Sequence, residues 1–268
     1  MPKLTTEDLI PLKNIKSIPR YWESLKPQND IGGDLETSWK KQIEFLDNIS
    51  AQNNVVVMLI NTFTNRCLYM SDKLKVLSGI DPSCYLAETG MEYSVSRIHP
   101  NHITALMQVN RRFMNYYADN NKKGTNDVSL CINYLHRNGN DEYVQVLQRL
   151  VVLEVSDNGM PALTLYFINY VGHIKKSNSL SGVIVEPNKV TIFNFDPDKN
   201  CFDPAVTISD QEKKIIQMLS QGLDSRTMSK KLKISPHTVN THRRNLIKKT
   251  ECLDTTGVVA FAKLINLI

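Results

Sequence analysis

The sequence predicts an α+β protein, in which a five-stranded antiparallel sheet with helices is followed by an all-α unit of four helices. Alternating apolar and polar residues over 128–134 are typical of a strand with one buried face. Helix start and stop signals then recur at short intervals over roughly the last 60 residues. The 268 residues, of which 41% are hydrophobic and 22% charged, match an ordinary globular protein with room for two domains.

An amphipathic helix is predicted over residues 35–50, within an N-terminal helical extension that covers residues 1–49. Its apolar residues recur at helical spacing: Leu35, Trp39, Ile43, Leu46 and Ile49. This apolar face must be covered either by the sheet or by the same helix of a second copy.

A hairpin of two strands is predicted next, at residues 55–61 and 66–70. Residues 71–120 are predicted to form short helices that end in one longer helix, from about residue 101 to residue 118. Three more strands follow, at 128–134, 143–155 and 162–170. Asn138-Gly139 and Asn158-Gly159 join them, and this dipeptide favours a type I′ hairpin, so the strands are expected to be antiparallel.

Two short motifs accompany this order of elements. Ile98-His99-Pro100 precedes the long helix, and His136-Arg137-Asn138-Gly139 lies at a predicted hairpin. With these motifs, residues 50–172 resemble a PAS domain. The resemblance implies a sensor domain.

Residues 173–206 are predicted to connect this domain to the C-terminal helices. They contain a further hairpin around Pro187-Asn188, flanked by alternating apolar residues. We therefore expect the connector to pack on the sensor or on the C-terminal domain, and so to constrain their relative orientation.

The positive charge of the chain is concentrated in residues 207–268, which hold 11 basic and five acidic side chains. The preceding residues hold 21 basic and 22 acidic side chains. Residues 225–250 contain eight basic side chains and no acidic one. Such a stretch is typical of a surface that binds a polyanion, although a solvated helix face has the same composition.

Four helices are predicted in the C-terminal segment. The first begins at the capping box Ser209-x-x-Glu212 and ends before Gly222, which permits a turn. The second follows from about Asp224. Residues 255–268 provide the fourth.

The third helix is predicted over residues 236–250. Ser235 is a favoured N-cap residue, and Pro236 suits the first helical position because its missing N–H group has no partner there in any case. Val239 and Leu246 face inward. The outer face is polar and basic.

Two short helices joined by a tight turn are typical of a helix-turn-helix, in which the second helix lies in the major groove of DNA. Arg can pair with guanine, Asn with adenine, and a Thr methyl can contact a thymine methyl. We predict base contacts by His237, Asn240, Thr241 and Arg244. We predict phosphate contacts by Ser225, Arg226, Thr238, Arg243 and Lys248.

Residues 208–250 resemble the DNA-binding domain of the LuxR family of bacterial transcription regulators. The residues that match the pattern of the family are Ser209, Glu212, Gly222, Ile234, Ser235, Thr238, Val239 and His242. Asn240 stands where many members have Lys, and Thr227-Met228-Ser229 stands where they have Glu-Ile-Ala. The resemblance implies a transcription regulator that binds double-stranded DNA.

The last helix, within 255–268, is apolar on more than one face and so must be buried. The other three helices, the N-terminal part or a second copy could cover it. The resemblance implies dimerisation through this helix, and we favour a second copy because three short helices cannot cover so many apolar residues. The predicted dimerisation residues are Val258, Val259, Phe261, Leu264 and Ile265.

Common catalytic motifs are missing from the sequence, which has no Gly-rich phosphate loop, HExxH pair or GxSxG elbow, so we expect no enzyme. The five cysteines have no CxxC spacing, which argues against disulfides and a zinc site. Some PAS proteins hold haem near the start of the long helix, but we interpret His99 and His102 there as turn histidines. No cofactor or metal site is evident.

No membrane segment is predicted, because the longest apolar run, Val55–Ile60, is far shorter than the roughly 18 residues of a membrane span. The N-terminus lacks the features of a secretory signal, so we expect a cytoplasmic protein.

Together these features predict a bacterial one-component transcription regulator that forms a homodimer. A small-molecule or protein signal at the PAS-like domain would change the packing of the connector and the last helix. Two alternatives remain open. The N-terminal domain could be of the autoinducer-binding type, or it could recruit a protein partner while the basic segment binds DNA without sequence preference.

Overall fold

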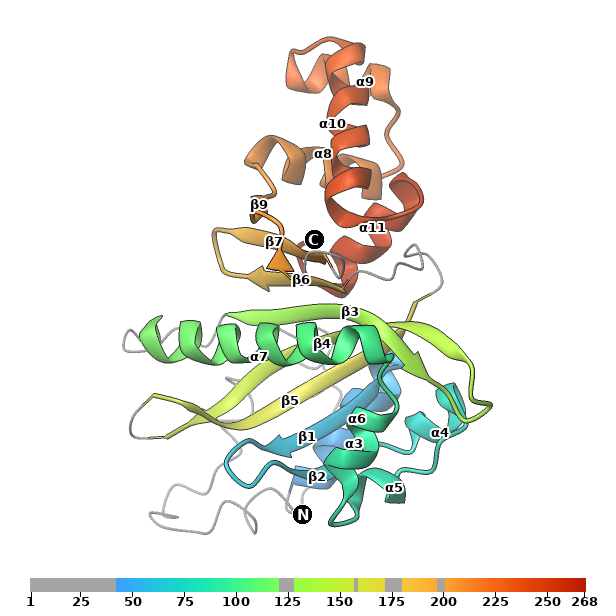
Figure 1. Cartoon of the computed structure of the whole chain (residues 1–268). Coiled ribbons are helices and arrows are strands. Elements are labelled where there is room, and N and C mark those ends of the chain that lie inside the picture. Colours follow the sequence, from blue (N-terminus) through green and yellow to red (C-terminus); the bar gives the residue numbers. More distant parts are fainter. Residues whose placement is uncertain (1–41, 121–127, 157–158, 172–179, 197–200) are drawn as a thin grey trace.

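The computed structural model describes residues 42–120, 128–156, 159–171, 180–196 and 201–268. An antiparallel sheet with helices is followed by a unit of four helices that lies beyond the β6–β7 end of the sheet (Figure 1). The predicted α+β class is therefore confirmed. No helix in the described part of the chain is long and apolar enough to cross a membrane.

The sheet has nine strands among the described residues. They are β1 Val56–Asn61, β2 Arg66–Met70, β3 Ser129–Arg137, β4 Tyr143–Val155, β5 Pro161–Tyr170, β6 Leu180–Val185, β7 Val190–Asp196, β8 Cys201–Phe202 and β9 Val206–Thr207. Their order is β2-β1-β5-β4-β3-β6-β7-β8, and β9 pairs with β7. The first five strands in this order are the predicted ones, and the order strand, strand, helices, three strands is confirmed.

The predicted number of five strands is wrong, because residues of the connector add β6 to β9 to the same sheet. β6 pairs with β3 along Ser129 to Asn133, and β6 and β7 form a hairpin whose turn contains Pro187 and Asn188. The alternating apolar residues of this hairpin explain the difference, since an amphipathic strand gains both hydrogen bonds and burial by pairing with the edge of the sheet.

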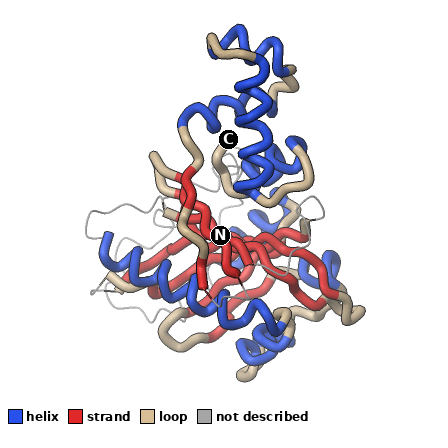
Figure 2. The backbone as a smooth tube through the Cα atoms, turned by 45° about the horizontal axis from the view of Figure 1, so that its top comes forward, coloured by secondary structure: helices blue, strands red, loops and turns tan. Residues whose placement is uncertain are grey.

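Four helices cover one face of the sheet (Figure 2). They are α4 Lys73–Ser78, α5 Ser83–Leu86, α6 Gly90–Ser96 and α7 Pro100–Asn120. The main hydrophobic core lies between them and the sheet, where Val109 and Phe113 of α7 are fully buried. This long helix agrees with the one predicted from about residue 101 to 118.

Helix α3, Ile43–Asn53, packs on the opposite face of the sheet. Its Leu46 and Ile49 are fully buried in a cluster with Val57 and Phe167 of the sheet. Of the two covers left open for this helix, the sheet is therefore the one observed. The predicted residues Leu35 and Trp39 lie outside the described residues.

The turn between β3 and β4 differs from the predicted two-residue hairpin at Asn138-Gly139. Residues 138–142 form the connection, and the side chain of Asn138 accepts hydrogen bonds from the backbone N–H groups of Asn140 and Glu142. A Cβ atom on Gly139 would lie 2.6 Å from the carbonyl oxygen of Gly79, which follows α4. Gly139 is therefore required for close packing of two loops rather than for a type I′ turn.

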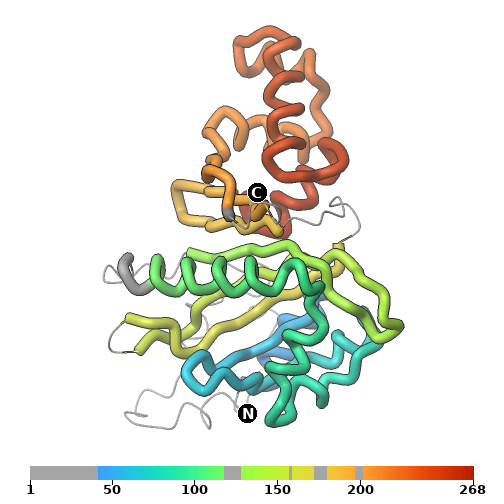
Figure 3. The backbone as a smooth tube through the Cα atoms, in the orientation of Figure 1, coloured from blue at the N-terminus to red at the C-terminus, as the bar shows by residue number. Residues whose placement is uncertain are grey.

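The C-terminal unit contains four helices, as predicted (Figure 3). They are α8 Asp210–Ser220, α9 Ser225–Leu232, α10 Pro236–Thr250 and α11 Thr255–Leu264. Gly222, in the turn after α8, has a φ of +74°, a conformation that glycine adopts without strain. Helix α11 lies nearest to the sheet, whereas α9 lies at the far end of the unit (Figure 1).

Candidate DNA-binding interface and cavity

The start of α8 is fixed by the predicted capping box. The side chain of Ser209 accepts a hydrogen bond from the backbone N–H group of Glu212, and the Glu212 carboxylate accepts one from the backbone N–H group of Ser209. Lys249 at the end of α10 forms an ion pair with this carboxylate, with an Nζ–Oε2 distance of 2.8 Å. Burial raises the pKa of Glu212, but the hydrogen bonds from Lys249 and Ser209 outweigh burial and lower it.

Helices α9 and α10 begin at side-chain caps and are separated by a short turn. Asp224 accepts a hydrogen bond from the backbone N–H group of Thr227, and Ser235 accepts one from that of Thr238. Lys233 follows α9 with a φ of 55°, so the chain turns sharply there. The cap at Ser235 fixes the start of α10, and the helix spans Pro236–Thr250, so its predicted bounds are confirmed.

The inner side of this pair packs into the core of the C-terminal unit. Met228 of α9 and Val239 and Leu246 of α10 are fully buried, as are Ile215 and Ile216 of α8. The predicted inward positions of Val239 and Leu246 are therefore confirmed. Their burial fixes which face of α10 remains available to a partner.

The predicted base-contacting residues lie on the opposite face of α10. His237, Asn240 and Arg244 are exposed, and Thr241 is half-buried. Thr241 donates a hydrogen bond to the carbonyl oxygen of His237, and Arg244 donates one to the Thr241 hydroxyl. This face of α10 is therefore polar, and three of its four predicted side chains are exposed to solvent.

The predicted phosphate-contacting residues divide into two groups. Arg226 and Lys248 are exposed and Thr238 is half-buried. Ser225 and Arg243, by contrast, bond to each other, with 2.7 Å between Nη1 of Arg243 and Oγ of Ser225. These two residues therefore also hold α9 against α10.

This contact belongs to a small polar network that sequence reasoning did not find. The Ser225 hydroxyl donates to Oδ1 of Asn240 at 2.7 Å, and Arg243 also donates to the Thr255 hydroxyl of α11 at 3.3 Å. Residues from three helices thus fix the position of the Asn240 side chain. Helix periodicity places residues on a face, but it does not show which of them bond across helices.

Residues 206–262 match the family model of bacterial regulatory proteins of the luxR family. This segment is a LuxR-family DNA-binding domain. The chain therefore carries the DNA-binding domain of a bacterial transcription regulator, and residues 206–262 are called the LuxR-type domain below.

Comparisons of the whole chain give more distant likenesses. No curated protein sequence matches it. Among solved structures, it is similar to the N-terminal domain of a diguanylate cyclase with a PAS/PAC sensor from Marinobacter aquaeolei, at 15% identity and a TM-score of 0.35, covering 43% of this chain and 94% of that chain. The Vibrio cholerae VqmA dimer is similar at 11% identity and a TM-score of 0.30, covering 85% and 88%. The Rhodobacter sphaeroides LOV protein is similar at 15% identity and a TM-score of 0.35, covering 52% and 71%.

The predicted dimerisation residues, four in α11 and Ile265 directly after it, are covered to different extents. Val258, Phe261 and Ile265 are buried within a single chain, and Val259 and Leu264 are half-buried. Of the covers left open for this segment, the favoured second copy is not needed to bury the first three residues. Residues of α8, α10 and the β6–β7 hairpin form the cluster that covers them.

The LuxR-type domain is joined to the sheet by polar contacts as well as by this cluster. Lys213 of α8 donates to the carbonyl oxygen of Asn188 in the hairpin turn at 3.1 Å, and Ser181 of β6 donates to the Glu251 carboxylate at 3.3 Å. The backbone N–H group of Ile208 donates to the carbonyl oxygen of Val190 in β7. The hairpin therefore contacts both parts of the chain, as expected of the connector.

A cavity of about 690 Å³ lies between the sheet and helices α6 and α7. Its buried wall includes Met58, Ile60, Ile98, Leu106, Tyr134 and Tyr166. Glu92 and Arg111 are exposed at the rim, and Oδ1 of Asn110 is buried there without a hydrogen-bond partner among the described residues. A volume of this size matches the sites of small-molecule ligands.

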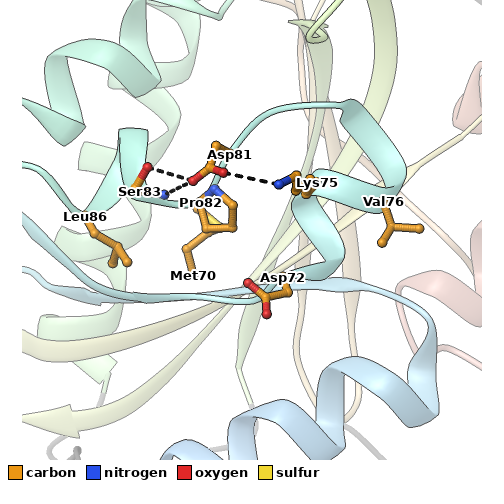
Figure 4. Close-up of a pocket in the computed structure, with 8 residues that line it drawn as sticks. All are labelled: Met70, Asp72, Lys75, Val76, Asp81, Pro82, Ser83 and Leu86. Atoms are coloured by element: carbon orange, nitrogen blue, oxygen red, sulfur yellow. Dashed lines mark hydrogen bonds and ion pairs between the residues drawn. The ribbon is translucent and has the colours of Figure 1, made fainter.

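A second pocket, of about 540 Å³, lies between α4 and α5 (Figure 4). Asp81 there accepts hydrogen bonds from the backbone and hydroxyl of Ser83 and pairs with Lys75 at 3.6 Å. The polar groups that Figure 4 joins are thus already bonded to one another, and Val76 at the edge is 75% exposed. The cavity beside α7 is the better candidate for a ligand.

Sequence reasoning found no pocket, because the aromatic spacings suit an ordinary core. One signal was present: Gln148 interrupts the apolar residues on the inner face of β4, and it accepts a hydrogen bond from the Tyr134 hydroxyl at 2.8 Å. His102 is fully buried, and its Nδ1 accepts a hydrogen bond from the backbone of Leu135. Among the described residues, no group of three or more His, Cys, Asp or Glu side chains could hold a metal ion.

Proposed function

We propose that this protein is a one-component transcription regulator, in which a signal bound by the N-terminal domain changes how the LuxR-type domain binds duplex DNA. The exposed face of α10 carries this proposal, because Asn240 and Arg244 lie on it while its inner face packs into the LuxR-type domain. Asn and Arg at these positions suit paired hydrogen bonds with adenine and guanine in the major groove. The proposal requires no catalytic group, and we propose no enzymatic activity.

We propose that the regulator binds DNA as a homodimer, so that two copies of α10 enter adjacent major grooves. Val259 and Leu264 retain exposed surface within one chain, and Leu253, just before α11, is 62% exposed. These residues are the ones that a second copy can cover. The remaining apolar residues named in α11 already pack inside the chain.

In this proposal, the signal binds in the cavity beside α7. Ile103, Leu106 and Asn110 of α7 line the cavity, so a molecule bound there contacts this helix directly. A ligand can favour one arrangement of α7 over another only if it contacts the two arrangements differently.

The later turns of α7 contact the strands that support the LuxR-type domain. The Tyr116 hydroxyl donates to the Glu186 carboxylate at 2.5 Å, and the guanidinium of Arg112 lies 4.5 Å from the centre of the Phe202 ring. Glu186 belongs to the same turn as Asn188, which accepts a hydrogen bond from Lys213 of the LuxR-type domain. A movement of α7 would therefore shift this turn and, with it, the orientation of α8.

The experiment that tests the proposal is a selection of DNA fragments by the full-length protein, followed by fluorescence anisotropy on the best fragment and on a scrambled one. Sequence-specific regulators bind their sites roughly 10³-fold or more tightly than unrelated DNA. We expect a preference of this order, and we expect Arg244→Ala to reduce it. Lys214→Ala is the matched control, because it removes a positive charge from an exposed position of α8 that is neither a predicted DNA contact nor a predicted dimer contact.

Equal affinity for both fragments, with a strong dependence on salt, would contradict the proposal. That outcome would favour a module that recruits a protein partner and binds DNA only through its charge.

A further inference from the structure

The cavity beside α7 has walls whose chemistry restricts the ligand. Much of its lining is aliphatic or thioether: Met58 and Ile60 of β1 and Leu106 of α7 are buried, and Met91 and Val95 of α6 are half-buried. Such a surface favours a ligand with an apolar body, because contact removes apolar area of both from water.

The buried polar groups of this wall are uncharged. Tyr134 donates to Gln148, and burial raises the pKa of both Tyr134 and Tyr166, so both phenols stay neutral. Among the residues that line the cavity in the described part of the chain, the charged side chains are Glu92 and Arg111, and both are exposed at the rim. A charged ligand group would therefore lose its water inside without gaining an opposite charge, which is costly.

Asn110, a residue that lines the cavity, carries a buried acceptor without a donor. Oδ1 of Asn110 has no hydrogen-bond partner among the described residues, although it is closed off from solvent. An unpaired buried carbonyl oxygen costs free energy, and rotation of the Asn110 side chain toward a donor on a ligand would remove that cost. Asn110 belongs to α7, the helix whose Tyr116 contacts the β6–β7 turn. The proposed bond would therefore act on the helix that contacts the hairpin.

We propose that the cavity binds a neutral, largely apolar small molecule that donates one hydrogen bond, from an N–H or O–H group, to Oδ1 of Asn110. This inference rests on the proposed sensing role of the N-terminal domain and names the chemical class of its signal.

Two dyes that differ in one charged group test the inference. N-phenyl-1-naphthylamine is neutral and apolar and has a single N–H group, and 1-anilinonaphthalene-8-sulfonate has the same rings with an added sulfonate. Titration of the full-length protein, followed by dye fluorescence, is expected to give at least about tenfold tighter binding of the neutral dye. That factor corresponds to about 1.4 kcal/mol.

Two cavity variants show whether the dye occupies the proposed site. Leu106→Trp fills the cavity and is expected to weaken binding of the neutral dye at least about tenfold. Met107 lies at the rim and is 61% exposed, so Met107→Trp obstructs the opening without disturbing the core and is expected to act in the same direction. Val76→Trp, on the exposed surface of α4, is the matched control and should leave binding unchanged.

Asn110→Leu tests the hydrogen bond itself, because leucine has nearly the same shape and no acceptor. Loss of one hydrogen bond is expected to weaken the neutral dye by about three- to tenfold. Asn48→Leu, on α3, is the matched control, because its side chain bonds to the backbone of Glu44 away from the cavity. Equal binding of both dyes, or neutral-dye binding that neither tryptophan variant weakens, would overturn the inference. Neutral-dye binding that Asn110→Leu leaves unchanged would overturn its hydrogen bond.

DNA binding, measured in parallel without dye, separates this inference from the proposed function. A protein that prefers one DNA sequence but shows either of these overturning results contradicts only the class of ligand. A protein without sequence preference contradicts the proposed function itself, whatever the dyes do.

Discussion

The hydroxyl of Tyr116, in the last part of α7, donates a hydrogen bond to the carboxylate of Glu186 in the β6–β7 turn. Burial raises the pKa of Tyr116 to about 12, and the bond to Glu186 acts in the same direction, so the hydroxyl keeps its proton near neutral pH. On its other side the same turn accepts a hydrogen bond from Lys213 of α8. One four-residue turn thus contacts both the helix that lines the cavity and the first helix of the LuxR-type domain.

Tyr116→Phe is expected to loosen this turn, because the carboxylate loses a charge-assisted hydrogen bond at a half-buried site. A loss of about 1 kcal/mol would speed backbone hydrogen exchange over residues 186–189 roughly fivefold, with a smaller increase at the start of α8. Hydrogen exchange measured by mass spectrometry checks this. Tyr69→Phe is the matched control, since the Tyr69 hydroxyl bonds to Asp47 of α3. If both variants change the turn equally, the Tyr116 contact has no specific role.

Arg244→Ala and Asn240→Ala are each expected to cost about 1–3 kcal/mol in binding to a selected DNA site, while binding to random DNA changes little. The reason is that paired hydrogen bonds to a base edge discriminate between sequences. Anisotropy titrations at one fixed salt concentration measure both affinities. Equal losses on the two DNAs would refute base contacts by these residues.

Ser225→Ala is expected to weaken specific binding less than Asn240→Ala does, because the Ser225 hydroxyl, which accepts from Arg243 and donates to Oδ1 of Asn240, positions the Asn240 amide but leaves it present. The same titration measures it. Ser220→Ala is the matched control, because the Ser220 hydroxyl bonds to the backbone of Gln217 within α8. A loss for Ser225→Ala larger than that for Asn240→Ala would indicate that Ser225 itself contacts DNA.

Lys248→Ala is expected to weaken binding to all sequences alike and to reduce the slope of log affinity against log salt by about 1. Lys248 is exposed near the end of α10, where it can neutralise a phosphate. Titrations at several salt concentrations give the slope. A change confined to one DNA sequence would instead assign Lys248 to a base.

Acid is expected to destabilise the sheet domain through His136, whose Nε2 lies 3.0 Å from the Tyr85 hydroxyl. Burial and the nearby charge of Arg97 lower the pKa of His136 to about 4 from an ordinary 6.5. The folded state therefore disfavours the proton that the unfolded chain takes up, so stability is full above pH 6.5 and falls as the pH drops toward 4. The shift corresponds to a loss of about 3 kcal/mol.

Urea unfolding of the wild type and of His136→Gln between pH 7 and pH 4 measures this effect. The variant should lose less stability over that range, whatever its stability at pH 7. The groups around the ring are Tyr85, Tyr170 and Arg97. Burial raises the pKa of both tyrosines, so neither phenol titrates in this range. An equal acid loss in both proteins would assign the effect to other groups.

The LuxR-type domain could be predicted closely because its helices are delimited by local chemistry. Ser209 with Glu212, and Ser235 with Pro236, satisfy backbone donors within one turn, so the start of each helix depends on neighbouring residues alone. The exposed face of α10 follows from its two buried residues in the same way.

Other features depended on contacts that are distant in sequence. Asn138-Gly139 suggested a two-residue hairpin turn, but a glycine is needed at 139 because the backbone of Gly79 packs closely against it. The burial of α11 could not be judged from three helices, because the β6–β7 hairpin contributes to the covering cluster. The cavity arises where β1, α6 and α7 meet, and no single segment encodes it.

The pairing of β6 with β3 also determines how the sheet ends. Without β6, the backbone of β3 from Ser129 to Asn133 would be an open edge, lined by groups that can pair with any extended chain. A fragment cut after residue 171 would therefore expose a long apolar edge and tend to associate edge to edge. The strands that support the LuxR-type domain thus also protect the sheet against aggregation.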